Sequence, residues 1–438
     1  MLPDYLAKAV PNAQSNRAPW YKNTAPTYAG TFLWIAFYSA IGVGTLTRAP
    51  LSLLLLGLAA AGLLCYMFYY VPAMLGMKTG YPLYVVASST FGVRGGYAMP
   101  GLLMGVLQVG WFAVGTMFAT KFVLSAIGSQ AGPGTLPFII VGLVWALGMG
   151  YVGVQGIKYV ARVALLLNSI PLVMLIIVFA RTSPGISQHQ VTDAAPYVGV
   201  TLIMQMVIGF FATAGAAGTD FGMSSRDGRD VKWGGLVGIA LAVLIAGGLA
   251  LLAVAGAKSM MPDLTVYTFE AVIGGMGGWL ASGMFFLFIV ASIPPSCFCA
   301  FIIGNCFSTM IPSVSRMAST MVSVTIAAIL AVTGVTQDLI GIFTIVGASF
   351  GPVCGAMTAD YLLSGGKWLG PREGINWAGY GAWAAGFLVG ILTFIPGFEG
   401  YQESVQPLAL WSFVTGFVVY LILAKLGLES KTVPMAAK

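Results

Sequence analysis

Long apolar runs joined by short polar segments dominate this sequence. Each run is about 18 to 28 residues long, which is enough for a helix to cross the hydrocarbon core of a bilayer. Hydrophobic residues make up 58% of the chain and charged residues only 8%, which is not the balance of a soluble domain. A membrane β-barrel would show short strands of alternating polarity instead, and the sequence lacks that pattern. It therefore predicts an all-α polytopic membrane protein.

Twelve spanning segments are predicted, numbered here in chain order. They lie near 27–46, 51–76, 97–124, 135–154, 157–181, 197–221, 234–257, 273–309, 317–334, 337–363, 376–396 and 407–427. The eighth is the longest because an amphipathic approach, from Glu270 to Trp279, precedes its core. An even number of crossings places the two terminal tails, 1–26 and 428–438, on one side of the membrane, whereas a count of eleven would separate them.

The positions of lysine and arginine predict that the tails are cytoplasmic. With the N-terminus inside, only Arg48, Lys121, Arg181 and Lys258 of the 20 lysines and arginines lie in outside segments. The predicted location is the plasma membrane, which in a bacterium is the inner membrane, with lipid around the helices. Because the net charge of +7 is spread over loops, it does not indicate a nucleic-acid partner.

Cysteine and histidine usage does not favour a metal centre. All five cysteines lie inside apolar segments, and the only histidine, His189, lies in a loop. We therefore expect buried structural thiols and no cofactor. The pattern also lacks a nucleophile with an acid–base pair, so an enzyme is not predicted. A receptor is an alternative, but the short tails leave no room for a signalling domain, and no obligate protein partner is inferred.

Glycine-rich stretches are predicted to interrupt two segments. Residues 39–44 (SAIGVG) lie in the first segment and residues 209–218 (GFFATAGAAG) in the sixth. Glycine weakens a helix by up to about 1 kcal/mol, and unwound backbone at membrane depth normally lines a cavity. Because the two segments are five apart, they favour an inverted repeat of 27–181 and 197–363, with 376–427 as two peripheral helices. Close packing of small residues is the alternative.

Two further features concern polar groups near helix ends. The eighth segment is predicted to break at 291–296 (ASIPPS), where freed carbonyls and the hydroxyls of Ser292 and Ser296 suit a small cation; a simple proline kink is the alternative. Asp220 and Asp360 end the sixth and tenth segments. They are expected to pair with Arg226 or Lys367, with a coupling or gating role as the alternative.

One face of the third segment carries Gln108, Trp111 and Gly115, at i, i+3 and i+7. That face offers an amide, a large flat ring and a gap, and a polar group inside the membrane is costly unless something satisfies it. It indicates one wall of a small-molecule site. The alternative is that Gln108 bonds a neighbouring helix and Trp111 is core.

Several motifs resemble those of a known transporter family. They are Gly76–Gly80 (GMKTG), Phe91–Gly95 (FGVRG), Gln108–Phe112 (QVGWF), Thr219–Phe221 (TDF) and Ala359–Leu362 (ADYL). Over about residues 30 to 425 the chain resembles the nucleobase:cation symporter family, also called the purine-cytosine permease family, and most closely the bacterial cytosine permeases. The resemblance implies a fold similar to the bacterial leucine transporter, with substrate among the first, third, sixth and eighth helices.

The resemblance also implies roles for individual residues. Gln108 would pair with the edge of a heterocycle and Trp111 would stack under its ring. Phe211 would stack opposite, beside the backbone of Gly209 and Phe210. The remaining implied substrate positions are Tyr38 and Ser39 on the first helix and Phe288 on the eighth, where cytosine permeases place an asparagine.

A coupling ion is implied in the same way. The implied sodium ligands are carbonyls of Trp34 and Phe37 with groups of Phe288, Ala291 and Ser292, of which only Ser292 keeps a hydroxyl, so proton coupling stays open. The predicted function is a secondary active transporter that imports a nucleobase or related small heterocycle by alternating access. An amino-acid or amine carrier of the same fold is the alternative.

Overall fold

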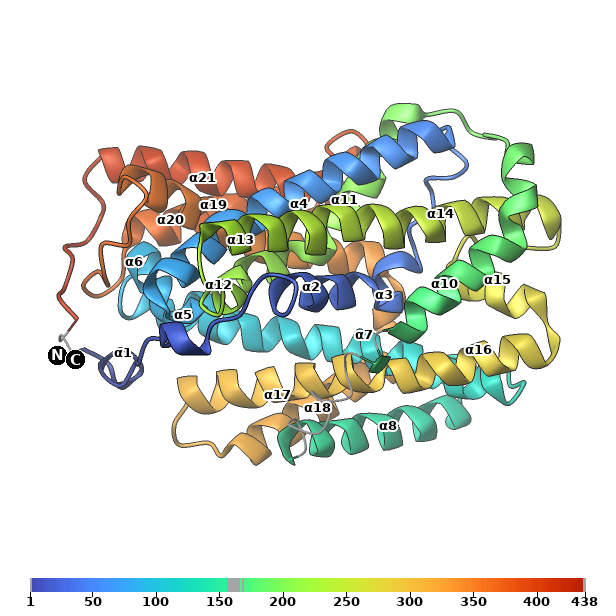
Figure 1. Cartoon of the computed structure of the whole chain (residues 1–438), viewed down its shortest axis with the longest axis horizontal. Coiled ribbons are helices and arrows are strands. Elements are labelled where there is room, and N and C mark those ends of the chain that lie inside the picture. The colour runs from blue at the N-terminus through green and yellow to red at the C-terminus, as the bar shows by residue number, and fades with distance from the viewer. Residues whose placement is uncertain (1, 156–165, 168, 436–438) are drawn as a thin grey trace.

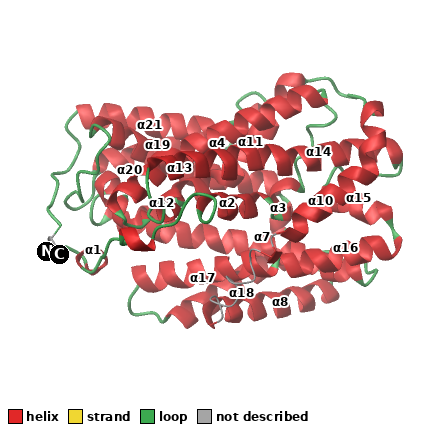
Figure 2. Cartoon of the chain, in the orientation of Figure 1, coloured by secondary structure: helices red, strands yellow, loops and turns green. Residues whose placement is uncertain are grey.

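The computed structural model describes residues 2–155, 166–167 and 169–435 as a bundle of mostly parallel and antiparallel helices (Figure 1). All regular structure in these residues is helical (Figure 2). Nine helices in this part of the chain are long and apolar enough to cross a membrane. They are α4 (Leu51–Thr79), η2 with α7 (Tyr97–Ala126), α8 (Leu136–Gln155), α10 with η3 (Ser169–Gln188), α11 (Pro196–Ala216), α13 to α14 (Gly228–Met260), α16 with α17 (Gly278–Met310), α19 (Leu339–Leu363) and α21 (Leu408–Lys425). The chain is a multi-pass membrane protein.

The other three predicted segments form shorter helices. The first contains α2 (Thr24–Phe32) and α3 (Ile35–Tyr38), the ninth is α18 (Arg316–Val332), and the eleventh is α20 (Trp377–Gly390). The start of the fifth segment, with Lys158 and Arg162, lies outside the described residues. The count of twelve spans therefore stays a prediction.

The first segment is interrupted twice. Residues 39–49 form turns rather than helix, as the stretch at 39–44 predicts, and Gly44 has φ +68°. A second break, which the sequence did not reveal, separates α2 from α3 at Leu33 and Trp34, and Trp34 is extended with ψ 132°. This second break brings the Trp34 indole to the third helix.

The predicted interruption of the sixth segment at 209–218 is largely wrong. The helix α11 continues through Gly209 and Gly215 and stops only at Ala217, before the short helix α12 (Gly218–Gly222). A Cβ on Gly209 would overlap the carbonyl oxygen of Phe343, and one on Gly215 would lie 3.0 Å from Cβ of Phe68. These glycines allow close helix packing, which was the alternative explanation.

The eighth segment begins later than predicted and breaks where predicted. Residues Phe269–Met276 form a separate helix, α15, which ends because Gly277 and Gly278 have φ +63° and +62°. Helix α16 (Gly278–Ala291) then gives way to α17 (Ile293–Met310) at Ser292. Pro294 lies in the first turn of α17, where a missing N–H costs little, so the prolines begin a new helix.

The helices pack in two groups. Helix α4 packs on α11, α12 and α14, and α2 packs on α13 and α14. Helices α7 and α8 pack on α17 and α18, and α7 also packs on α16. The first group holds the predicted first, second, sixth and seventh segments, and the second holds the third, fourth, eighth and ninth.

Both ends of the described chain lie on one side of the bundle. Leu2 and Val433 pack against the same small cluster, built from Tyr5, Leu6 and neighbouring residues, at the end of the bundle where Figure 1 shows the short helix α1 (Asp4–Ala7). We call this the terminal side. Helix α15 lies at the opposite end of the bundle, which we call the distal side (Figure 1).

The two acids that were expected to pair with Arg226 or Lys367 have other partners. Asp360 accepts from Arg372 at 2.8 Å, and both side chains are buried. Asp220 accepts from the backbone N–H of Leu83 at 3.1 Å, while Arg226, just before α13, pairs at 2.7 Å with Asp230 in the first turn of that helix. The prediction of those ion pairs is therefore wrong: Arg372, brought in by the loop after α19, takes the place of Lys367.

Candidate functional site

Trp111 lies at the centre of a cluster of aromatic rings from four segments. Its ring centroid is 5.7 Å from Trp34 at the break of the first segment, 5.1 Å from Phe210 on α11, and 5.8 Å from Phe343 on α19. Phe210 also lies 5.5 Å from Phe343. The indole N–H of Trp111 donates to Thr213 Oγ1 at 3.3 Å, which fixes the ring against α11. We call Trp34, Trp111, Phe210 and Phe343 the aromatic cluster.

Phe211 does not lie opposite Trp111. Its ring stacks on Phe32 of α2, with centroids 5.5 Å apart and planes 13° apart, and it also contacts Tyr28. Neighbouring residues on a helix point about 100° apart, so the ring that meets Trp111 is that of Phe210. The expected stacking pair is corrected to Trp111 and Phe210, which contact each other edge to face.

Within the part of the chain that the structure describes, the amide of Gln108 has no oxygen partner. Its Nε2 lies 3.8 Å from the sulfur of Met104, one turn earlier on the same helix, and the side chain is only part-buried. The other amide in this region is fully used: Gln205 donates to Thr344 Oγ1 at 3.2 Å and accepts from Ala409 N at 2.8 Å. The alternative in which Gln108 bonds a neighbouring helix therefore does not describe it.

Two side chains that carry an unpartnered polar group approach Gly115. A Cβ on Gly115 would lie 3.2 Å from Cζ2 of Trp34 and 3.5 Å from Oγ of Ser296. Among the described residues, Trp34 Nε1 and Ser296 Oγ are both buried without a hydrogen-bond partner. Buried polar groups almost always have partners, so two such groups on side chains that converge on one glycine make this region the candidate binding site. The break of the first segment, the gap on the third and the break of the eighth converge here.

Sequence reasoning found these residues only in part. Gly115 and Ser296 were named, but Trp34 was considered only for its carbonyl, and Phe343 and Thr213 were missed. The indole of Trp34 could not be placed because the break at Leu33 has no glycine or proline in it. Phe343 lies in the strongly apolar tenth segment, where any aromatic ring is ordinarily core.

The residues implied as substrate contacts on the first and eighth helices contact other parts of the protein. Ser39 donates its hydroxyl to the carboxylate of Glu270 on α15. The Tyr38 ring meets Phe269 of α15 edge to face at 5.2 Å, and its hydroxyl is buried without a partner. Phe288 is buried with its ring 5.4 Å from Phe122, where it packs between α16 and α7.

The implied sodium ligands are partly bonded to one another. Ser292 Oγ donates to the carbonyl of Phe288 at 2.8 Å, and the carbonyl of Trp34 accepts from Phe37 N at 2.9 Å. The Trp34 carbonyl and the Ser292 hydroxyl each keep a second lone pair, which suits a hard cation. The Phe288 carbonyl also accepts from Ser292 N at 3.0 Å, so both of its lone pairs are engaged. Among the described residues no group of three His, Cys, Asp or Glu side chains could hold a metal ion.

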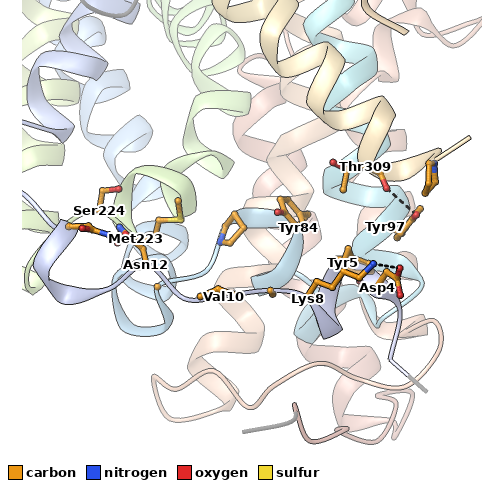
Figure 3. A pocket seen from close by; sticks show the side chains of 15 residues that line it. Asp4, Tyr5, Lys8, Val10, Asn12, Tyr84, Tyr97, Met223, Ser224 and Thr309 are labelled. Atoms are coloured by element: carbon orange, nitrogen blue, oxygen red, sulfur yellow. Dashed lines mark hydrogen bonds and ion pairs between the residues drawn. The ribbon is translucent and has the colours of Figure 1, made fainter. Parts of the chain in front are cut away.

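A cavity of about 840 Å³ opens on the terminal side (Figure 3). It lies between the N-terminal tail, the ends of α4 and α12, and the ends of η2 and α17, and Tyr84, Tyr97, Ser224 and Thr309 line it. Tyr5 of the tail donates to the carbonyl of Val93 at 2.7 Å. The cavity therefore lies at the boundary between the two helix groups on the terminal side.

The fold is that of several membrane transporters. The chain is similar to the inward-facing conformation of Mhp1, with TM-score 0.74 and 14% identity over 96% of this chain and 92% of that chain. It is also similar to Mhp1, a nucleobase-cation-symport-1 family transporter, in a closed conformation with bromovinylhydantoin bound, with TM-score 0.68 and 15% identity over 96% and 94%.

A Na⁺-coupled sialic acid symporter in a substrate-bound outward-open state gives TM-score 0.60 and 15% identity over 98% of this chain and 95% of that chain. A manganese transporter of Eremococcus coleocola gives 0.56 and 12% over 97% and 98%. No protein-family model and no curated protein matches the sequence. At these identities the likeness shows the fold, and these structures are of transporters rather than enzymes.

Proposed function

We propose that this protein is a secondary active transporter that imports a nucleobase or a related small neutral heterocycle. The observation that carries the proposal is the convergence of the Trp34 indole ring and Ser296 Oγ on Gly115, beside the aromatic cluster. Trp34 Nε1 and Ser296 Oγ are both buried without a hydrogen-bond partner among the described residues. Aromatic faces stack on a flat ring, while one N–H donor and one hydroxyl bond its polar edge. None of these side chains is charged, which favours a neutral ligand over an amino acid or amine.

Gln108 is a further candidate ligand for the heterocycle. It lies three residues before Trp111, and the structure gives its amide a single contact among the described residues, from Nε2 to the sulfur of Met104. In this proposal it reaches the ligand after its side chain leaves the sulfur of Met104. Tyr38, whose hydroxyl is also unpartnered, is the corresponding candidate on the first segment.

The proposed topology has twelve spans, with an inverted repeat of 27–181 and 197–363, both tails cytoplasmic and the protein in the plasma membrane. The terminal side is then the cytoplasmic side. Two observations support this: both ends of the chain meet in one cluster, and lysine and arginine concentrate in segments on that side. Transport would proceed by movement of the first, second, sixth and seventh segments against the rest of the core.

The proposed coupling ion is sodium, held by carbonyls of Trp34, Phe37, Phe288 and Ala291 with the hydroxyl of Ser292, or else a proton. Sodium would add charge at the breaks of the first and eighth segments, next to the aromatic cluster. If uptake is unchanged when choline replaces sodium, the sodium part of the proposal is wrong.

Uptake tests the substrate class. Cells lacking their own permeases would express the protein and receive labelled cytosine, uracil, hypoxanthine, allantoin or hydantoin. We expect accumulation of at least one, abolished by Trp111→Ala, with Trp233→Ala as a control, since Trp233 is half exposed on α13. No accumulation of any compound by protein that is present in the membrane would contradict the proposal.

A further inference from the structure

Glu270 is a buried carboxylate that joins three parts of the protein on the distal side. It lies in the first turn of α15, and its side chain is only 8% exposed. One oxygen accepts from Ser39 Oγ of the first segment, and the other accepts from Lys121 Nζ of α7 at 3.2 Å. The carboxylate therefore bridges the two helix groups through a loop helix that belongs to neither.

Around this bridge, α15 and the loop before it make further contacts with the first segment. Phe269 N donates to the carbonyl of Ser39 at 3.2 Å, and the Phe269 ring meets Tyr38 edge to face. A Cβ on Gly42 would lie 2.7 Å from the carbonyl oxygen of Tyr267, so the loop before α15 presses on the first segment. Together these contacts cover the first segment from the distal side.

The charges around Glu270 are few. Lys121 on α7 is its ion-pair partner, and that side chain is 47% exposed. Lys258 on α14 donates instead to the carbonyl of Leu264 at 2.7 Å and lies over the ring of Tyr267. The hydroxyls of Ser39 and Tyr38 are the facing groups on the first segment. A buried carboxylate is stable only while it is paired and hydrogen-bonded, so the bridge holds its partners together.

We propose that Glu270 is the latch of the distal gate: it holds the first segment to the third helix, and the link between Ser39 and Glu270 must break before the site opens on the distal side. The proposal rests on the alternating-access function proposed above. It also gives Ser39 a different role from the substrate contact that the family resemblance implies, because its hydroxyl is already donated to Glu270.

The alternative role for Glu270 is to stabilise the N-terminus of α15, and it makes a different prediction. An acid in the first turn stabilises a helix through its N–H groups and dipole, and Thr268 already caps α15 by accepting from Ala271 N at 3.4 Å. In that case losing Glu270 would loosen α15, but losing the hydroxyl of Ser39 would have no effect on the gate.

Cysteine accessibility separates the two roles. Ser296→Cys places a near-isosteric thiol at the site, and a membrane-impermeant methanethiosulfonate is added outside intact cells. Labelling of the five native cysteines, measured in protein without the Ser296→Cys reporter, gives the background rate. Gly274→Cys, on α15 with open space around it, must react rapidly in every background, which checks that the distal side faces the reagent.

We expect Glu270→Gln to raise the reaction rate of the reporter by roughly ten-fold or more, because the ion pair with Lys121 is lost and the Ser39 hydroxyl no longer has a charged acceptor. Ser39→Ala, which leaves the ion pair with Lys121, should raise it by a smaller factor. The matched control is Glu399→Gln, in the loop before α21, where Gly397 N is the one donor to the carboxylate among residues 2–155, 166–167 and 169–435. It should leave the rate unchanged.

An unchanged rate in both variants would overturn the latch, and so would a rise in Glu270→Gln without one in Ser39→Ala. If Glu270→Gln is absent from the membrane, Ser39→Ala alone decides. The readout needs no transported substrate, so a failed uptake panel would contradict the substrate class without touching the latch. Slow labelling of Gly274→Cys would instead contradict the proposed topology.

Discussion

Trp111 donates its indole N–H to Thr213 Oγ1 at 3.3 Å, across the boundary between α7 and α11. The bond joins the two helix groups at the level of the aromatic cluster and sets the plane of the central ring. Because both residues are buried, the N–H has no access to water when the acceptor is lost.

Thr213→Val should therefore destabilise the protein. A buried donor left without a partner costs about 1–3 kcal/mol, so thermal unfolding in detergent should begin at a lower temperature. Thr213→Ser keeps the acceptor and should melt close to the wild type. Equal melting of the Val and Ser variants would mean that the bond contributes nothing.

Close approach of α4 and α12 gives a second prediction. A Cβ on Gly222 would overlap the carbonyl oxygen of Ala73, so Gly222→Ala must push the two helices apart. We expect a loss of roughly 1–3 kcal/mol, as for other overpacked sites. Gly148→Ala on α8 meets nothing within 4 Å and should be neutral or stabilising. Thermal melting of the pair checks the contrast, and equal losses would contradict it.

The buried ion pair of Arg372 and Asp360 gives a third prediction. The two side chains are 4% and 6% exposed, 2.8 Å apart, and Ser89 and Thr90 also donate to Asp360. Arg372→Met leaves a buried carboxylate without its cation, which costs about 3–5 kcal/mol. The variant should express poorly or melt far below the wild type. Asp4→Asn breaks an exposed pair with Lys8 and should change little. Similar melting of both variants would show that burial does not matter here.

Gly115→Ala separates binding from stability. The added methyl would lie 3.2 Å from Trp34 and 3.5 Å from Ser296, which small shifts of the two side chains can accommodate. The ligand-free protein should melt at or above the wild-type temperature, because alanine favours helix. Uptake should fall, since the methyl occupies the gap between the Trp34 ring and Ser296 Oγ. Gly283→Ala, in open space on α16, is the control and should leave uptake unchanged.

The helical membrane architecture was predictable from the sequence, because the lengths of the apolar runs and the polar segments between them decide where helices cross a bilayer. The break at 291–296 was predictable for a similar reason, since prolines exclude an uninterrupted helix. The break at Leu33 was not, because tertiary packing, rather than local propensity, holds Trp34 extended. Gly209 was misinterpreted as part of a helix break, because glycine occurs both where helices break and where two helices pack closely.

The candidate site was predictable only as a region. Sequence spacing placed Trp111 and Gly115 on one face, but it could not distinguish Phe210 from Phe211, which are adjacent and differ only in direction. Glu270 was noted as part of an amphipathic approach. Its partners Ser39 and Lys121 come from distant segments, and a single sequence does not show which distant residues meet.

The most direct test of the proposed site is the thermal shift of Ser296→Ala with and without the heterocycle that the protein accumulates. Removing an unpartnered buried hydroxyl should leave the ligand-free melting temperature unchanged or raised. Ser308→Ala, on the same helix, removes a hydroxyl that bonds its own backbone and serves as the control. We predict that Ser296→Ala loses most of the ligand-induced stabilisation while the control keeps it. A full ligand-induced shift in Ser296→Ala would contradict the account.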